Sequence, residues 1–140
     1  MVIVFDLPHV FNPSAQRGEN ARALRVLLEC LIALNRAHLL NHAERPLYRA
    51  GVVYGRTKEW QTIPALYKLG YGDCKSLTAA LITEYREAGI PANPVFRWVI
   101  NRKTGFRDFH ILVQTDSGYE DPSKVLGMGR EFDVTEVDYE

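Results

Sequence analysis

The sequence predicts one α+β domain in which helices pack on an antiparallel β-sheet. Two stretches with helical spacing, residues 20–41 and 74–88, come first, and strand-like stretches follow between residues 95 and 121. Helices followed by a meander of strands are typical of an α+β plan, with helices covering one side of the sheet. A length of 140 residues with 46% hydrophobic residues suits a single domain, residues 1–140, around one core.

The charge and the apolar pattern argue against several partners. Seventeen basic and seventeen acidic residues give a formal net charge of zero, so no basic excess points to nucleic acid. The most apolar stretch, residues 24–40, contains several polar side chains and predicts an amphipathic helix rather than a membrane span. Residues 1–6 lack the basic region, apolar stretch and cleavage site of a signal peptide. We therefore expect a cytoplasmic protein without a membrane or nucleic-acid partner.

The first predicted helix covers residues 20–41, after a segment, residues 1–11, that is either a short strand or an extended arm. Ser14 is a candidate cap for a helix that starts earlier. Helical spacing places one apolar stripe against the core: Leu24, Leu27, Leu28, Leu31, Leu34 and His38. Further apolar residues predict packing on more than one side of this helix: Val26, Ile32 and Leu39. Cys30, among leucines in mid-helix, is expected in the core.

The middle of the chain leads into the second helix. The short apolar stretch at residues 52–54 is either a strand or a loop. Trp60 and Gln61 follow, and each carries a side-chain N–H that needs an acceptor when buried. The helix that begins near Cys74 should end at Gly89, because a glycine there suits the C-terminal cap.

The second half of the chain predicts the sheet. Three strands are expected, with a fourth as an option: residues 95–100, 109–115, 119–121 and 132–137. The basic segment 101–105 should form a hairpin loop, and residues 116–118 a tight turn. Pro122 should end the third strand, because proline lacks the N–H that continues a ladder.

Cys74 is the candidate nucleophile, because it stands at the first turn of a helix. There the unpaired N–H groups and the helix dipole favour an anion, which can lower a thiol pKa well below about 8.5. Asp73 should cap the helix by accepting from the amide of Ser76, and Gly72 should allow a tight turn and a close substrate. The alternative is that Cys74 is a small buried hydrophobic residue.

A nucleophilic cysteine needs a base and a group that orients the base, and His110 and Asp121 are the candidates. A turn centred on residues 117–118 would place Asp121 opposite a residue near Thr115, so its carboxylate would have to reach along the sheet to His110. Asp108 and Asp116 are rival orienting residues. The alternative is a satisfied core histidine and an aspartate that serves only the turn.

Metal and cofactor chemistry is not expected. His38 and His42 are four residues apart on a helix, but no third ligand completes a zinc site, so a solvated helix end explains them better. Without an export signal both cysteines should be free thiols. A disulfide between Cys30 and Cys74 is a weaker alternative.

Four motifs then occur in a fixed order within residues 60–123: Gly72-Asp73-Cys74, Gly89-Ile90-Pro91-Ala92, His110-Ile111-Leu112-Val113 and Gly118-Tyr119-Glu120-Asp121-Pro122-Ser123. In this order they resemble the transglutaminase-like superfamily of papain-type cysteine enzymes. The resemblance covers about half of the chain. Short members with a Gly-Asp-Cys motif also resemble phage-encoded proteins, which makes a viral or prophage origin plausible and a virion-associated location an alternative.

The resemblance implies a triad of Cys74, His110 and Asp121 on a papain-like, transglutaminase-like core. It also implies acyl transfer through a thioester on a peptide or protein amide substrate, by proteolysis, deamidation or transamidation. Trp60 and Gln61 are then the candidate oxyanion donors, beside the Cys74 backbone N–H. The rival hypothesis is an inactive binding or assembly module on the same fold, such as a phage structural protein with a protein partner.

Overall fold

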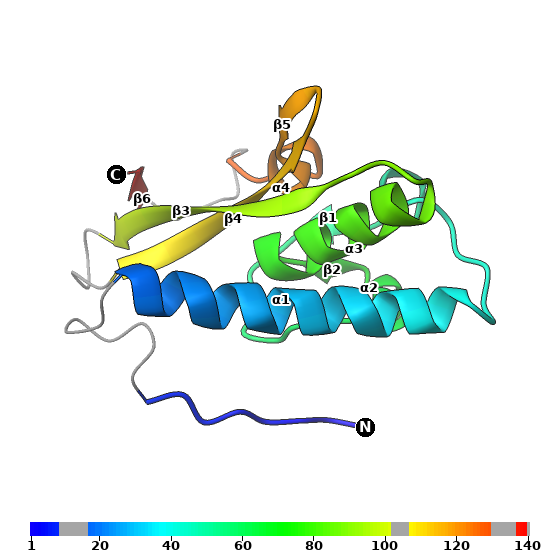
Figure 1. The fold of residues 1–140 in the computed structure, drawn as a ribbon, viewed down its shortest axis with the longest axis horizontal. Helices are drawn as coiled ribbons and strands as arrows, with labels where there is room; N and C mark the ends of the chain where they lie inside the picture. Colours follow the sequence, from blue (N-terminus) through cyan, green and yellow to red (C-terminus); the bar gives the residue numbers. More distant parts are fainter. Residues whose placement is uncertain (9–16, 102–106, 130–136, 140) are drawn as a thin grey trace.

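The computed structural model describes residues 1–8, 17–101, 107–129 and 137–139 of the chain, and it is a mixed α+β structure with a small antiparallel sheet (Figure 1). The elements follow in this order: α1 (Arg17–Leu39), the 3-10 turn η1 (Leu47–Arg49), β1 (Val53–Tyr54), α2 (Ile63–Leu69), β2 (Tyr71–Gly72), α3 (Cys74–Glu87), β3 (Asn93–Asn101), β4 (Arg107–Thr115), β5 (Gly118–Glu120), α4 (Pro122–Val125) and β6 (Val137–Tyr139). Within the described ranges, no helix has the length and apolar character needed to cross a membrane.

The main sheet has four strands in the order β5-β4-β3-β6, and every neighbouring pair is antiparallel. The predicted hairpin of β3 and β4 is confirmed, with Arg97 opposite His110. A second, two-stranded sheet pairs β1 with β2 in parallel, so the strand reading of residues 52–54 is the right one. The short strand β2, which comes directly before α3, was not predicted.

Helix α3 is the central element of the fold, with α1 on one side and the sheet on the other (Figure 1). Every residue from Cys74 to Thr83 is buried, not only the face that carries Leu77 and Leu81. The helix ends as predicted, because Ala88 caps it and Gly89 follows with a φ of 77°, which favours glycine.

Helix α1 buries one face only, so part of the sequence prediction was wrong. The core side consists of four apolar residues and two asparagines: Asn20, Leu24, Leu28, Leu31, Ile32 and Asn35. Leu34, predicted for the core stripe, is 52% exposed, and Cys30 is exposed as well. The reason is that α3 covers only the face centred on Leu28 and Ile32, and α1 has apolar residues on a second face too.

Two short helices were missed because each carries a proline in its first turn. Pro64 in α2 and Pro122 in α4 stand where the missing N–H costs nothing, since the first N–H groups of a helix have no partner within it. Residues 1–7 form neither a helix nor a strand and are exposed, which fits the extended arm. Ser14, the loop at 102–105 and most of the optional strand 132–137 lie outside the described residues; Val137 begins β6.

Candidate active site

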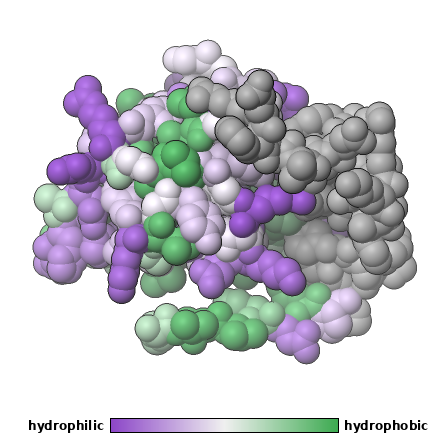
Figure 2. Space-filling model, turned by 180° about the vertical axis from the view of Figure 1, so that it is seen from behind, coloured by the Kyte–Doolittle hydropathy of each residue, from purple (hydrophilic) through white to green (hydrophobic). Residues whose placement is uncertain are grey.

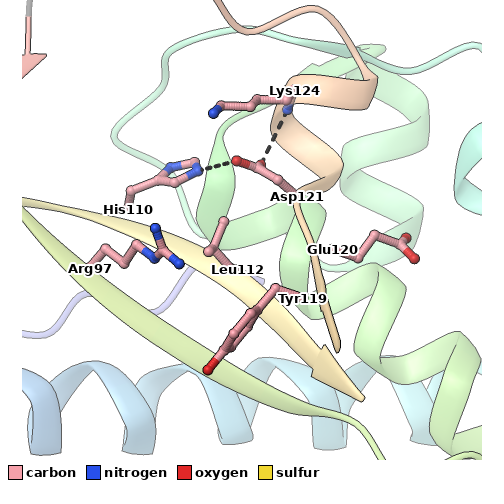
Figure 3. Close-up of a pocket in the computed structure, with 7 residues that line it drawn as sticks. All are labelled: Arg97, His110, Leu112, Tyr119, Glu120, Asp121 and Lys124. Carbon is pink, nitrogen blue, oxygen red and sulfur yellow. Dashed lines mark hydrogen bonds and ion pairs between the residues drawn. The ribbon is translucent and has the colours of Figure 1, made fainter. Parts of the chain in front are cut away.

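The structure joins two of the predicted site residues directly. The His110 ring meets the Asp121 carboxylate with 2.8 Å between Nε2 and Oδ2, and both side chains are largely buried (Figure 3). His110 comes from the middle of β4, and Asp121 follows the last residue of β5. Because Nε2 faces the carboxylate, any proton exchange with a nucleophile has to use Nδ1.

The strand register explains why this contact forms, and it corrects the sequence prediction. Thr115 pairs with Gly118 and Val113 with Glu120, so the turn contains only Asp116 and Ser117. If the register is continued by one residue, Asp121 falls beside Leu112, not opposite a residue near Thr115 as predicted. Residues 110 and 112 point to the same face of the strand, because side chains alternate along it. The carboxylate therefore has to reach only to the next residue on its own face.

Helix α4 fixes the direction of the Asp121 side chain. Asp121 is the N-cap of α4, and its Oδ1 accepts from the backbone N–H of Lys124 at 3.2 Å while Oδ2 faces His110. Burial raises the pKa of Asp121, but the His110 ring and the Lys124 N–H more than offset it, so the pKa lies below its ordinary value. The carboxylate is therefore charged at neutral pH and able to orient the imidazole.

We expect Asp121→Asn to lower the stability of the protein near neutral pH and to lose this effect in acid. The folded-state pKa of Asp121 lies below the unfolded value, so the contribution is present above about pH 4 and lost as the pH falls through the folded-state pKa. Urea unfolding of both proteins between about pH 3 and pH 7 measures the difference. A constant difference over this range would contradict the assignment of a charged Asp121.

Glu120, directly before Asp121, is held by two tyrosines that the sequence analysis did not identify. Tyr48 and Tyr85 donate their hydroxyl groups to the two carboxylate oxygens of Glu120 at 2.5 and 2.6 Å. The Glu120 hydrogen bond, together with burial, raises the pKa of Tyr85 to about 12. In Figure 3 the Glu120 side chain points away from His110, so the two tyrosine hydrogen bonds hold the end of β5 on the side opposite His110.

Cys74 is the first residue of α3, as predicted, and its side chain is 8% exposed. The cap differs in detail, because Asp73 accepts from the backbone N–H of Lys75 at 3.1 Å and not from Ser76. The Lys75 ammonium also forms an ion pair with Asp73 and donates to the Thr57 carbonyl at 2.9 Å. Burial raises the pKa of Asp73 although Lys75 lowers it. The Lys75 ammonium therefore offsets the negative charge of Asp73, which would otherwise disfavour a Cys74 thiolate at this helix end.

Lys75 could have been noticed in the sequence, because a lysine in the first turn of a helix opposes the dipole. The ion pair with the Asp73 carboxylate stabilises Lys75 in this position.

The start of α3 is tied to the strand that carries His110. Thr78 lies one helical turn after Cys74, and its hydroxyl donates to the carbonyl of Ile111 at 3.1 Å. Ile111 is the residue after His110 on β4, and it belongs to the same core cluster as Cys74. This bond places the first turn of α3 beside the middle of β4, and the two elements pack together.

The predicted oxyanion residues lie beside the turn into α3. Gln61 is buried, its Nε2 donates to the carbonyl of Tyr71 at 3.1 Å, and its backbone N–H donates to Ser76 Oγ at 2.9 Å. A Cβ on Gly72 would lie 2.6 Å from the Leu66 side chain and 2.7 Å from Gln61 Oε1, so these two side chains require a glycine here. The close approach of a substrate at Gly72 stays a prediction. The Trp60 ring is partly buried, with the Lys75 ammonium 5.9 Å from its centre.

A pocket of about 190 Å³ opens beside the His110–Asp121 pair. It is lined by residues of β3, β4, β5 and α4: Arg97, His110, Leu112, Tyr119, Glu120, Asp121 and Lys124. Figure 3 shows the basic side chains of Arg97 and Lys124 on either side of the His110 ring. The Arg97 guanidinium lies 5.8 Å from the centre of the Tyr119 ring, which holds it at the pocket.

The remaining histidines and cysteines do not form a second site in the described ranges. His38 and His42 stack with 4.5 Å between ring centres, and His38 Nε2 lies 2.8 Å from Glu44. Within those ranges no group of three His, Cys, Asp or Glu side chains is placed to hold a metal ion. Neither Cys30, which is exposed, nor Cys74, which is buried, forms a disulfide, which contradicts the disulfide alternative.

Comparisons with protein-family models, with curated proteins and with solved structures found no match for this chain.

Proposed function

We propose that the protein is a cysteine-dependent amide hydrolase or acyltransferase with a Cys74–His110–Asp121 triad. The observation that carries the proposal is the buried contact of 2.8 Å between His110 Nε2 and Asp121 Oδ2. It orients the imidazole in the way a base for a thiol needs. Cys74 begins the helix whose next turn is bonded to the strand of His110. A cysteine at a helix start, followed by a histidine and an oriented aspartate on successive strands, supports a transglutaminase-like core.

The reaction would proceed through a thioester. His110 takes the Cys74 proton, the thiolate attacks the amide carbonyl carbon, and the protonated His110 gives its proton to the leaving amine as the C–N bond breaks. Water, or an amine, then attacks the thioester and gives its proton to His110. The Cys74–acyl bond breaks and Cys74 returns as the thiol. Asp121 keeps the ring oriented and stabilises the imidazolium in both halves.

The tetrahedral intermediate needs donors for its oxygen. We assign this role to the backbone N–H of Cys74, at the positive end of α3, and to a side-chain N–H of Trp60 or Gln61. The Gln61 amide already holds the Tyr71 carbonyl, so only its second N–H can serve the intermediate.

The proposal predicts a burst of acylation at Cys74 with an activated ester such as p-nitrophenyl acetate. We expect close to one equivalent of p-nitrophenol per chain in the Cys30→Ser protein, followed by slow turnover, with the acetyl group found on Cys74 by mass spectrometry. Cys30→Ser is the right background because Cys30 is exposed and would acylate without catalysis. Cys30→Ser/Cys74→Ser is the matched control and should show no burst.

The same experiment distinguishes the reactions and tests the rival hypothesis. Added primary amine that accelerates turnover and collects the acetyl group indicates transamidation, whereas an unchanged rate indicates hydrolysis. A protein that folds normally but acylates Cys74 no faster than a free thiol would contradict the enzymatic proposal. That outcome would support the inactive binding or assembly module on the same fold.

A further inference from the structure

Helix α1 carries a second apolar face that this fold leaves uncovered. Helical spacing aligns its exposed apolar residues into one row, here called the α1 stripe: Val26, Cys30, Ala33, Leu34 and Ala37. Val26 is 63% and Leu34 is 52% exposed. No charged residue interrupts the row, since the arginines of α1 lie to one side of it. The sequence pattern predicts that α1 packs on more than one side, but in the described part of the structure α1 packs on one side only.

The N-terminal segment is a second uncovered apolar surface in the same chain. Six of residues 1–7 are large and apolar, and all six are exposed, from 41% for Leu7 to 89% for Val2 and 109% for Met1. Figure 1 draws this segment as an extended trace below α1, and Figure 2 shows it as a row of hydrophobic residues standing clear of the body. Apolar, β-branched segments of this kind are sites of association when they remain exposed.

We propose that the two surfaces cover each other in a homodimer, with residues 1–7 of one copy lying along the α1 stripe of the other. The segment is long enough for the stripe, because the six steps from residue 1 to residue 7 span about 20 Å when extended and the 11 steps from Val26 to Ala37 of a helix rise about 17 Å. The exchange is reciprocal, so a two-fold axis gives each copy the same pair of contacts. The dimer covers both apolar surfaces and leaves the His110–Asp121 pocket on other elements.

A second copy is the better occupant than the segment of the same chain. In the single chain the segment stays extended, and its residues are among the most exposed apolar residues of the protein. The stripe likewise stays open although the segment is joined to the same helix. The exposed segment and the exposed helix face therefore suit an exchange in which the segment of each copy lies on α1 of the other copy.

Cys30 lies in the α1 stripe, so the rate at which its thiol reacts shows whether the stripe is covered. We would measure sedimentation equilibrium at about 5–100 µM and the rate of Cys30 alkylation by iodoacetamide, both in the Cys74→Ser protein. We expect a dimer in which Cys30 reacts at least about ten-fold more slowly than in a monomer. Ile3→Ser/Phe5→Ser should give a monomer with fast alkylation, and so should Val26→Lys/Leu34→Lys. Leu69→Ser/Ile90→Ser removes two exposed apolar residues elsewhere and should leave the dimer intact.

Three results would overturn the inference. The first is a monomer at every concentration with Cys30 as reactive as in Ile3→Ser/Phe5→Ser. The second is a monomer with a protected Cys30, which would place the segment on its own helix. The third is a dimer that both pairs of substitutions leave intact. These outcomes do not depend on Cys74 chemistry, so the dimer and the proposed function fail separately.

Discussion

At about pH 6.5, His110→Ala should slow the alkylation of Cys74 about 100-fold. A thiol with an ordinary pKa of about 8.5 is only about 1% thiolate at this pH, whereas a thiolate paired with an imidazolium is largely formed. The oriented His110 ring is the group that makes the difference, because Asp121 holds it at 2.8 Å in a largely buried site. Asp121→Asn should give a smaller loss, since the ring remains but loses the charge that stabilises its protonated form.

The alkylation measurement has to distinguish the Cys74 thiol from the Cys30 thiol, and the effect of His110 from that of a histidine outside the site. All variants carry Cys30→Ser, because exposed Cys30 would otherwise dominate the rate of reaction with iodoacetamide. His42→Ala is the matched control, since His42 is exposed at the end of α1 and its ring contacts His38. It should leave the rate unchanged. Equal rates in His110→Ala and in the parent protein would remove the main support for a Cys74–His110 pair.

Asn35→Leu should cost about 3 kcal/mol of unfolding free energy, which corresponds to a fall of about 10 °C in Tm. Asn35 is fully buried in α1, its Oδ1 accepts from the backbone N–H of Ile63 at 2.7 Å, and its Nδ2 lies 3.4 Å from Thr83 Oγ1. It therefore caps α2 from another helix, because the N-cap residue Thr62 makes no side-chain cap. Leucine has a similar size but leaves the Ile63 N–H buried without its acceptor.

Urea unfolding measures this effect, with Asn41→Leu as the control. Asn41 is exposed after the end of α1, so the same substitution there should change the unfolding free energy by less than about 0.5 kcal/mol. A loss below about 1 kcal/mol for Asn35→Leu would show that the Ile63 N–H finds another partner.

Local signals predicted the parts of the site that depend on local structure. The start of α3 at Cys74 could be recognised because an aspartate cap precedes a helical pattern, and its end because Gly89 follows. The β3–β4 hairpin followed from two strand-like stretches around a polar loop. His110 and Asp121 were identified as the base and the orienting group that a nucleophilic Cys74 needs, and the structure joins them.

Features that depend on tertiary contacts were not predicted. Asn35 looks like an ordinary polar residue on a helix, and only the position of the start of α2 beside α1 shows that it accepts a hydrogen bond. Asp121 was placed opposite a residue near Thr115 because the turn was centred one residue too late, and a shift in register cannot be detected from composition. Cys30 was assigned to the core because α1 is apolar on two faces, and periodicity cannot tell which face this chain covers itself.

The most direct test of the account is a titration of the Cys74 thiolate by its ultraviolet absorbance in the Cys30→Ser protein. The spectrum of Cys30→Ser/Cys74→Ser is subtracted, so the difference reports one thiol only. The account predicts a thiolate that forms well below the ordinary pKa of about 8.5, and an inflection that returns toward that value in His110→Ala. A single inflection at or above about 8.5 in both proteins would contradict the proposed triad.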